Sequence, residues 1–102
     1  MTDRHSRDAI APLWELHRDS DWPAMLGANE GQLMMVDTVI SGCVTYYLEE
    51  HSLDDQRVQM LESCLSDLDG MLSDVEEEDA RSYFERSKTL ATLLLNVPRR
   101  EP

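Results

Sequence analysis

Apolar residues recur at steps of three and four along most of the chain, which is the spacing of one face of an α-helix. The clearest run lies between Ser52 and Val75, where most acidic side chains fall off the apolar stripe. That stripe consists of Val58, Leu61, Leu65, Leu68, Leu72 and Val75. The pattern predicts an amphipathic helix, capped by Ser52, with one apolar face and one strongly acidic face.

The stretches on either side of this helix show the same periodicity. Before it, a long helix is expected over residues 30–50, with Asn29 as its N-cap and Gln32 completing a capping box. After it, a final helix is expected to begin near Asp74 and to end at Pro98, because proline cannot continue a helix.

A shorter helix is expected near the N-terminus. Proline fits the first turn of a helix best, so this helix should begin close to Pro12 and end near Arg18. Residues 1–8 and 99–102 are polar and are expected to be mobile ends. The sequence therefore predicts an all-α protein with a single domain over residues 1–102, a small antiparallel bundle of three long helices plus a short N-terminal helix.

Acidic residues dominate the charge, and they are concentrated in one part of the chain. The formal net charge is −12, from 21 acidic and nine basic residues. Residues 49–79 hold twelve acidic residues and one basic residue, Arg57, which gives this segment a net charge of −11. Phosphate contacts need clustered lysine and arginine, so direct nucleic-acid binding and binding to an anionic membrane are not expected.

The first functional hypothesis is a non-enzymatic binding protein whose acidic surface engages a basic partner. Such a surface would inhibit a nucleic-acid-binding protein by covering its phosphate-binding face, a character shared with small acidic inhibitors of the immunity and antitoxin type. The candidate acidic residues are Glu62, Asp67, Asp69, Asp74, Glu76, Glu77, Glu78 and Asp79. The candidate aromatic contacts are Trp22, Tyr46 and Tyr47.

The alternative hypothesis is a self-associating structural bundle whose acidic face only keeps the protein soluble. The apolar surface near the end of the final helix is expected either to be deeply buried or to contact another subunit. Under the alternative hypothesis it forms a homodimer seam, made of Leu90, Leu93, Leu94 and Val97. A third, weaker option is a small-ligand pocket around Trp14, Trp22, Tyr46 and Gly42, and Gly42 also suggests a close helix crossing or a slight kink.

Candidate chemistry is sparse. Cys43 and Cys64 are most simply read as two buried, reduced thiols, with a redox pair as the minority alternative. His5, His17 and His51 do not share a metal-ligand spacing with the cysteines, so neither a metal nor another cofactor is predicted.

Two further expectations concern the surroundings of the chain and one of its charges. The polar N-terminus lacks the apolar core of a signal peptide, and no apolar run approaches the ~18 residues of a membrane span, so a cytoplasmic location is expected. Asp37 is the lone charge between Leu33 and Leu48, and we expect it to lie outside the core or to be paired.

Overall fold

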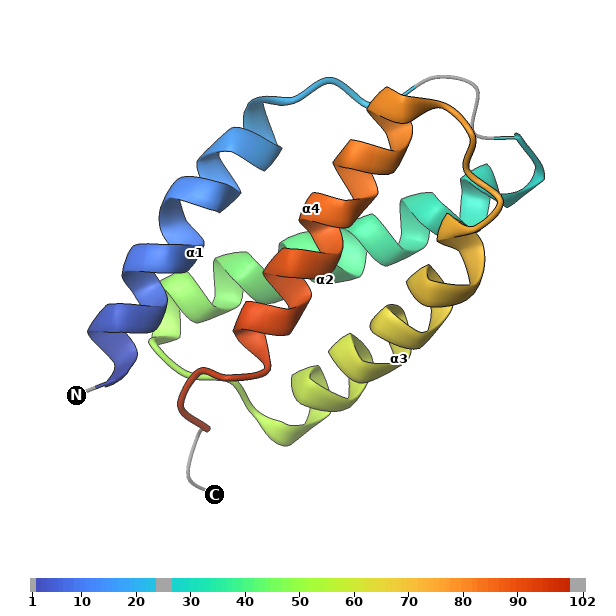
Figure 1. Ribbon diagram of the computed structural model, residues 1–102. Coiled ribbons are helices and arrows are strands. Elements are labelled where there is room, and N and C mark those ends of the chain that lie inside the picture. Colours follow the sequence, from blue (N-terminus) through green and yellow to red (C-terminus); the bar gives the residue numbers. More distant parts are fainter. Residues whose placement is uncertain (1, 24–26, 100–102) are drawn as a thin grey trace.

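A computed structural model of the protein describes residues 2–23 and 27–99. These ranges contain four long α-helices and one short 3₁₀ turn, and the expected all-α bundle is confirmed (Figure 1). The elements are α1 (Thr2–Asp19), η1 (Gly27–Asn29), α2 (Glu30–Glu50), α3 (Asp55–Leu72) and α4 (Glu78–Leu94).

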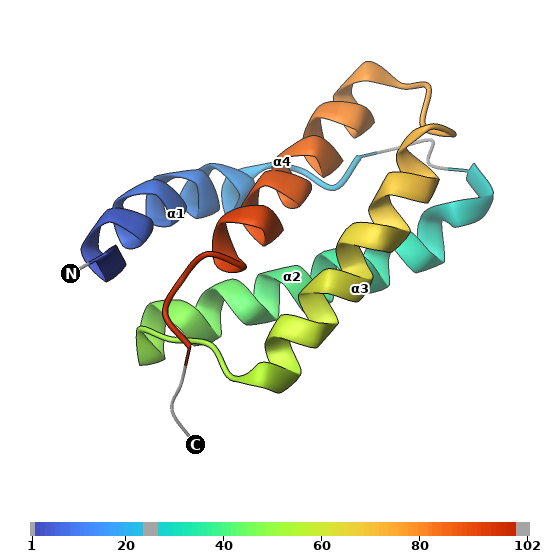
Figure 2. The same ribbon diagram turned by 60° about the horizontal axis from the view of Figure 1, so that its bottom comes forward.

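Helices α2 and α4 form the middle of the bundle. They pack against each other, and each also packs against both α1 and α3, which lie on either side of them. The α2–α3 connection lies near the N- and C-terminal parts of the chain, while the α3–α4 connection lies at the opposite end, near the start of α2 (Figures 1 and 2). The α2–α4 pair therefore forms the centre of the fold.

The core is closed at both ends by residues outside the helices. Leu53, in the α2–α3 connection, is fully buried, and its backbone N–H donates to the carbonyl of Pro98 at 3.1 Å. Val75, in the α3–α4 connection, is also buried, and its carbonyl accepts a bond from the Arg81 guanidinium at 3.1 Å. Pairing with Leu53 fixes the chain as far as Arg99, and residues 100–102 lie outside the described part.

The expected start of the N-terminal helix was wrong. Helix α1 begins at Thr2, so Pro12 lies in its interior and residues 2–8 are helical. Tertiary contacts before the proline account for this, because Ile10 is fully buried and the Arg7 guanidinium donates to the Leu48 carbonyl of α2 at 3.0 Å. These contacts offset the backbone bond that Pro12 cannot donate.

The expected caps were also wrong in detail. The N-cap of α3 is Asp54, whose carboxylate accepts from the Arg57 N–H at 2.9 Å and leaves Ser52 in the preceding turn. Asn29 precedes α2 as expected, but its side chain makes no capping bond.

The final helix is shorter than expected at both ends. Helix α4 begins at Glu78 and ends at Leu94, before the proline at position 98. Before its start, residues 75–77 are not helical, and Val75 of this segment is buried in the core.

Candidate functional site

Acidic side chains gather at the end of the bundle formed by the α3–α4 connection. All eight acidic residues predicted for the binding surface are exposed. Six of them lie at the end of α3, in the connection and in the first turn of α4, and form what we call the acidic end: Asp67, Asp74, Glu76, Glu77, Glu78 and Asp79.

The other two predicted acidic residues lie on the remaining surface of α3. The Asp69 carboxylate forms an ion pair with the Lys88 ammonium of α4 at 2.7 Å, and this bond raises the pKa of the lysine. Glu62 lies two turns earlier on α3 and is exposed. Asp69 therefore has a partner within the protein, whereas within residues 2–23 and 27–99 no ion pair is formed by the acidic end.

Asp21, just after the end of α1, adds negative charge to this end of the bundle, which the sequence pattern did not predict. Asp21 and Asp79 line the same hollow, of about 260 Å³, together with Ser20, Pro23, Ser82, Tyr83 and Arg86. These two aspartates are 58 positions apart in the sequence and come together only because α1 ends beside the start of α4. No signal in the spacing of acidic residues reveals this.

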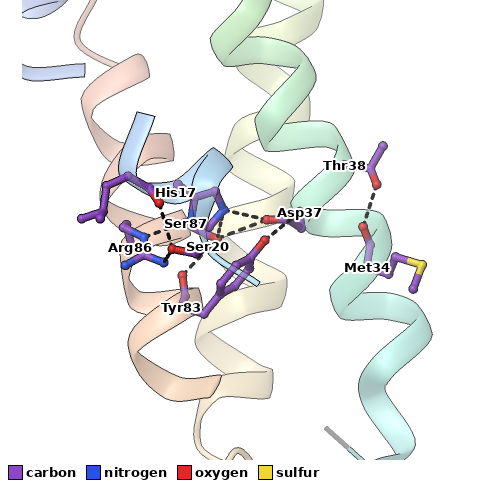
Figure 3. Close-up of polar contacts among 9 residues, drawn as sticks. His17, Ser20, Met34, Asp37, Thr38, Tyr83, Arg86 and Ser87 are labelled. Carbon is purple, nitrogen blue, oxygen red and sulfur yellow. Dashed lines mark hydrogen bonds and ion pairs between the residues drawn. The ribbon is translucent and has the colours of Figure 1, made fainter. Parts of the chain in front are cut away.

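A buried polar cluster joins α1, α2 and α4 next to that hollow (Figure 3). The His17 ring is 3% exposed, and its Nε2 lies 2.9 Å from Oδ1 of Asp37. Its Nδ1 accepts a hydrogen bond from Nε of Arg86 at 3.1 Å. Arg86 also donates to the Ser20 hydroxyl at 2.8 Å, so one guanidinium holds both the last turn of α1 and the residue after it.

The geometry around His17 assigns its tautomer. The Arg86 guanidinium keeps its proton, so the Nδ1 that faces it must be the acceptor. The proton of a neutral imidazole then resides on Nε2, which donates to Asp37. The ring therefore has no free lone pair for a substrate.

A serine close to a histidine and an aspartate invites comparison with a catalytic triad. The Ser87 hydroxyl lies 3.3 Å from Nε2 of His17, the same nitrogen that Asp37 occupies, whereas a triad uses the two ring nitrogens separately. The other nitrogen is occupied by Arg86, and Ser87 is fully buried. This cluster is thus a structural polar network, and it confirms that Asp37 is paired.

The Tyr83 hydroxyl completes the network by donating to Oδ2 of Asp37 at 3.3 Å. Burial raises the pKa of Tyr83 to about 12, and the neighbouring Asp37 carboxylate acts in the same direction. The tyrosine therefore stays a neutral donor across the physiological range.

The three predicted aromatic contacts occupy different environments. Trp22 is half-buried and packs edge-on against Phe84, with ring centroids 5.6 Å apart, at the same end of the bundle as the acidic end. Tyr46 is half-buried beneath the Arg57 guanidinium, 3.8 Å from its ring centroid. Tyr47 is 0% exposed, so its prediction as a partner contact was wrong.

Burial also rules out three of the four residues predicted for the homodimer seam. Leu90, Leu94 and Val97 are buried in the core, and Leu93 is half-buried. The apolar side chains around the end of α4 are used within the fold because α1, α2 and α3 all pack on this helix. The large apolar residues that the fold leaves exposed are Leu16, Met34, Met35 and Met60.

The proposed ligand pocket also lacks support. Trp14 packs near His17 on α1, while Tyr46 stacks with Arg57 of α3, so these rings lie in separate environments. Gly42 is exposed, and a Cβ there would meet nothing within 4 Å, so it does not mark a close helix crossing. Met25 and Leu26, which follow Trp22 in the α1–α2 connection and were candidates for an apolar anchor with it, lie outside the described residues.

Both cysteines are buried free thiols, as expected. Burial raises the pKa of Cys43 to about 11 and also raises the pKa of Cys64. Thiols with raised pKa values are poor nucleophiles at neutral pH. In the part of the chain that the structure describes, no group of three His, Cys, Asp or Glu side chains converges to hold a metal ion.

Two further findings bear on the class of the protein. None of the helices, taken over the described residues, has both the length and the apolar character needed to cross a membrane. Comparisons with models of protein families, with curated proteins and with solved structures found no match.

Proposed function

We propose that this protein is a non-enzymatic binding module whose acidic end engages a basic protein. The observation that carries the proposal is the set of six exposed carboxylates of the acidic end, which have no ion-pair partner among the described residues. Unpaired like charges held close together repel one another, and the lysines and arginines of a partner would relieve that repulsion.

The position of the charge favours a partner over simple solubility. A solubilising surface mixes both signs and spreads them. Here Asp21 lines the same hollow as Asp79, and the half-buried Trp22 packs against Tyr83, which also lines it. An aromatic ring bordered by charge is typical of an interface anchor.

Inhibition is the proposed mode of action. A basic protein that binds nucleic acid presents a surface of lysine and arginine to the phosphates. The acidic end would occupy that surface and compete with the nucleic acid, with electrostatic attraction speeding the encounter. An antitoxin or immunity protein would act in this way. Self-association stays a prediction, but three of the four residues first assigned to its seam are buried in the fold.

The proposal is tested by affinity capture followed by reconstitution. The immobilised protein is exposed to a lysate of its source cell at low and at high salt, and captured proteins are identified by mass spectrometry. We expect a basic protein that elutes at high salt, binds again when purified, and loses its nucleic acid when this protein is added.

A pair of charge-matched variants provides the control. Reversal of Asp74, Glu76 and Glu77 to lysine changes the net charge by +6, from −12 to −6. Reversal of Asp8, Glu15 and Glu49, which are exposed in α1 and α2, makes the same change away from the acidic end. Loss of binding in the first variant alone supports the proposal, and equal loss in both contradicts it.

A further inference from the structure

An apolar groove of about 220 Å³ lies between α2 and α3. Its apolar lining comes from both helices: Met35, Val36 and Val39 of α2, with Met60 and Cys64 of α3. One acidic residue, Asp67, lines the groove, and no lysine or arginine does. The groove is distinct from the hollow at the end of α1, which has an arginine in its wall.

Helix periodicity shows which way the groove faces. Two residues along a helix turn the side chain by about 200°. Asp37 lies two residues from both Met35 and Val39, and it accepts a hydrogen bond from α4. Similarly, Asp69 lies two residues after Asp67, and it pairs with α4. The groove therefore opens on the side of the α2–α3 pair turned away from α4.

Methionines project at this groove from both walls. Met35 is 62% exposed and Met60 is 39% exposed. A single exposed apolar residue is ordinary, but two that converge on one hollow form a contiguous apolar surface. Methionine is unbranched and polarisable, so it adapts to the apolar side chains of a partner.

The charge around the groove selects the kind of partner. Asp67 belongs both to the groove and to the acidic end, so the apolar surface leads directly into the acidic one. Asp74 follows the end of α3 in the chain and is exposed at the acidic end. At the other end of the groove the Arg57 guanidinium lies over the Tyr46 ring and is paired with the Asp54 carboxylate at 2.7 Å, so its charge is compensated within the protein. The complementary ligand is apolar along its length and basic at one end.

We propose that the groove binds the apolar face of a basic amphipathic helix, with the lysines and arginines of that helix beside Asp67 and Asp74. This proposal rests on the proposed function, since it names how the basic partner is held. An amphipathic helix presents apolar residues at steps of three and four, which is the arrangement that fills a groove between two helices. A second copy of this chain is disfavoured as the occupant because each copy carries a net charge of −12.

The test uses the full chain and a synthetic peptide. The peptide is an 18-residue helix of leucine and lysine with all leucines on one face. The control peptide has the same composition and charge, with the leucines distributed around the helix. Titration calorimetry at about 0.15 M salt, where the Debye length is about 8 Å, measures both affinities. We expect the one-faced peptide to bind at least about tenfold more tightly than the control peptide.

Two methionine variants locate the binding. Met35→Gln combined with Met60→Gln should weaken binding of the one-faced peptide at least about tenfold, since glutamine has a similar length and helix propensity but is polar. Met34→Gln is the matched control, because Met34 is 50% exposed on the same helix and does not line the groove. It should leave the affinity unchanged within about twofold.

Other outcomes separate this proposal from the proposed function. If both peptides bind alike and only the lysine variants of the acidic end lose affinity, the groove proposal is overturned and the acidic binding surface stands. If neither peptide binds, the groove proposal is overturned, and the capture experiment decides the function by itself. If sedimentation shows a dimer that the double methionine variant dissociates, a second copy is the occupant and the helix proposal is wrong.

Discussion

The Nε2 atom of His17 lies 2.9 Å from Oδ1 of Asp37, and this hydrogen bond links α1 to α2 where α4 covers both. Tyr83 and Ser87 of α4 reach the same carboxylate. The Asp37 carboxylate therefore accepts hydrogen bonds from side chains of α1 and α4. This makes the carboxylate the point at which the orientation of three helices is set.

Removal of this carboxylate should destabilise the fold. Asp37→Ala leaves the buried Nε2–H of His17 and the Tyr83 hydroxyl without their acceptor. We expect the free energy of unfolding to fall by about 2–4 kcal/mol, the range for buried polar groups that lose a charged partner. Urea denaturation followed by circular dichroism measures this.

The matched control is Asp8→Ala in α1, because Asp8 is exposed. Exposed substitutions of this kind usually change the free energy of unfolding by less than about 0.5 kcal/mol. A loss of stability in Asp37→Ala no larger than in Asp8→Ala would show that the network adds nothing to the fold.

The raised pKa of Tyr83 predicts a loss of stability in alkali. The tyrosine ionises near pH 10 in the unfolded chain and near 12 in the folded protein. Its contribution is therefore complete below pH 10 and is lost as the pH rises towards 12. Over this window it should lower the free energy of unfolding by up to about 1.4 kcal/mol per pH unit.

Tyr83→Phe separates this effect from the other groups that titrate in alkali. The variant cannot ionise at this position, so its stability should fall less steeply between pH 10 and 12 than that of the unchanged protein. Urea denaturation at several pH values gives the two slopes. Equal slopes would mean that Tyr83 ionises as easily in the folded protein as in the unfolded chain.

Local patterns were sufficient to predict the helical class and the bounds of α2. Residues 30–50 were expected to be helical, and they form α2 as predicted. The apolar periodicity of a helix can be recognised within one continuous stretch of sequence. Helix α1 was predicted too short because its first turns are held by contacts with α2, 41 residues away in the case of Arg7 and Leu48. A helix start predicted from the propensity of proline alone takes no account of such contacts.

The polar network around Asp37 also depends on contacts between residues that are far apart in the sequence. The lone charge at Asp37 in an apolar stretch was a usable signal, because it was expected to lie outside the core or to be paired. Its partner was not identifiable, since His17 lies 20 residues earlier and Tyr83 lies 46 residues later. The acidic surface was easier to predict, because charge clustered in sequence stays clustered on a helix and the following connection. Burial of Leu90 depends on which helices pack together, and sequence periodicity left that open.

The glycines offer a test of backbone energetics on a matched pair of sites. Gly42 lies inside α2 with open space around it, and Gly27 has a φ of +75° with open space around it. Gly42→Ala should raise the free energy of unfolding by about 1 kcal/mol, because alanine loses less conformational entropy in a helix. Gly27→Ala should lower it by about 1 kcal/mol, because an L-residue is strained at positive φ. Neither substitution meets a steric obstacle, so the opposite signs measure backbone conformation alone. Thermal and urea denaturation of both variants provide the comparison, and a stabilised Gly27→Ala would contradict the left-handed conformation at the start of η1.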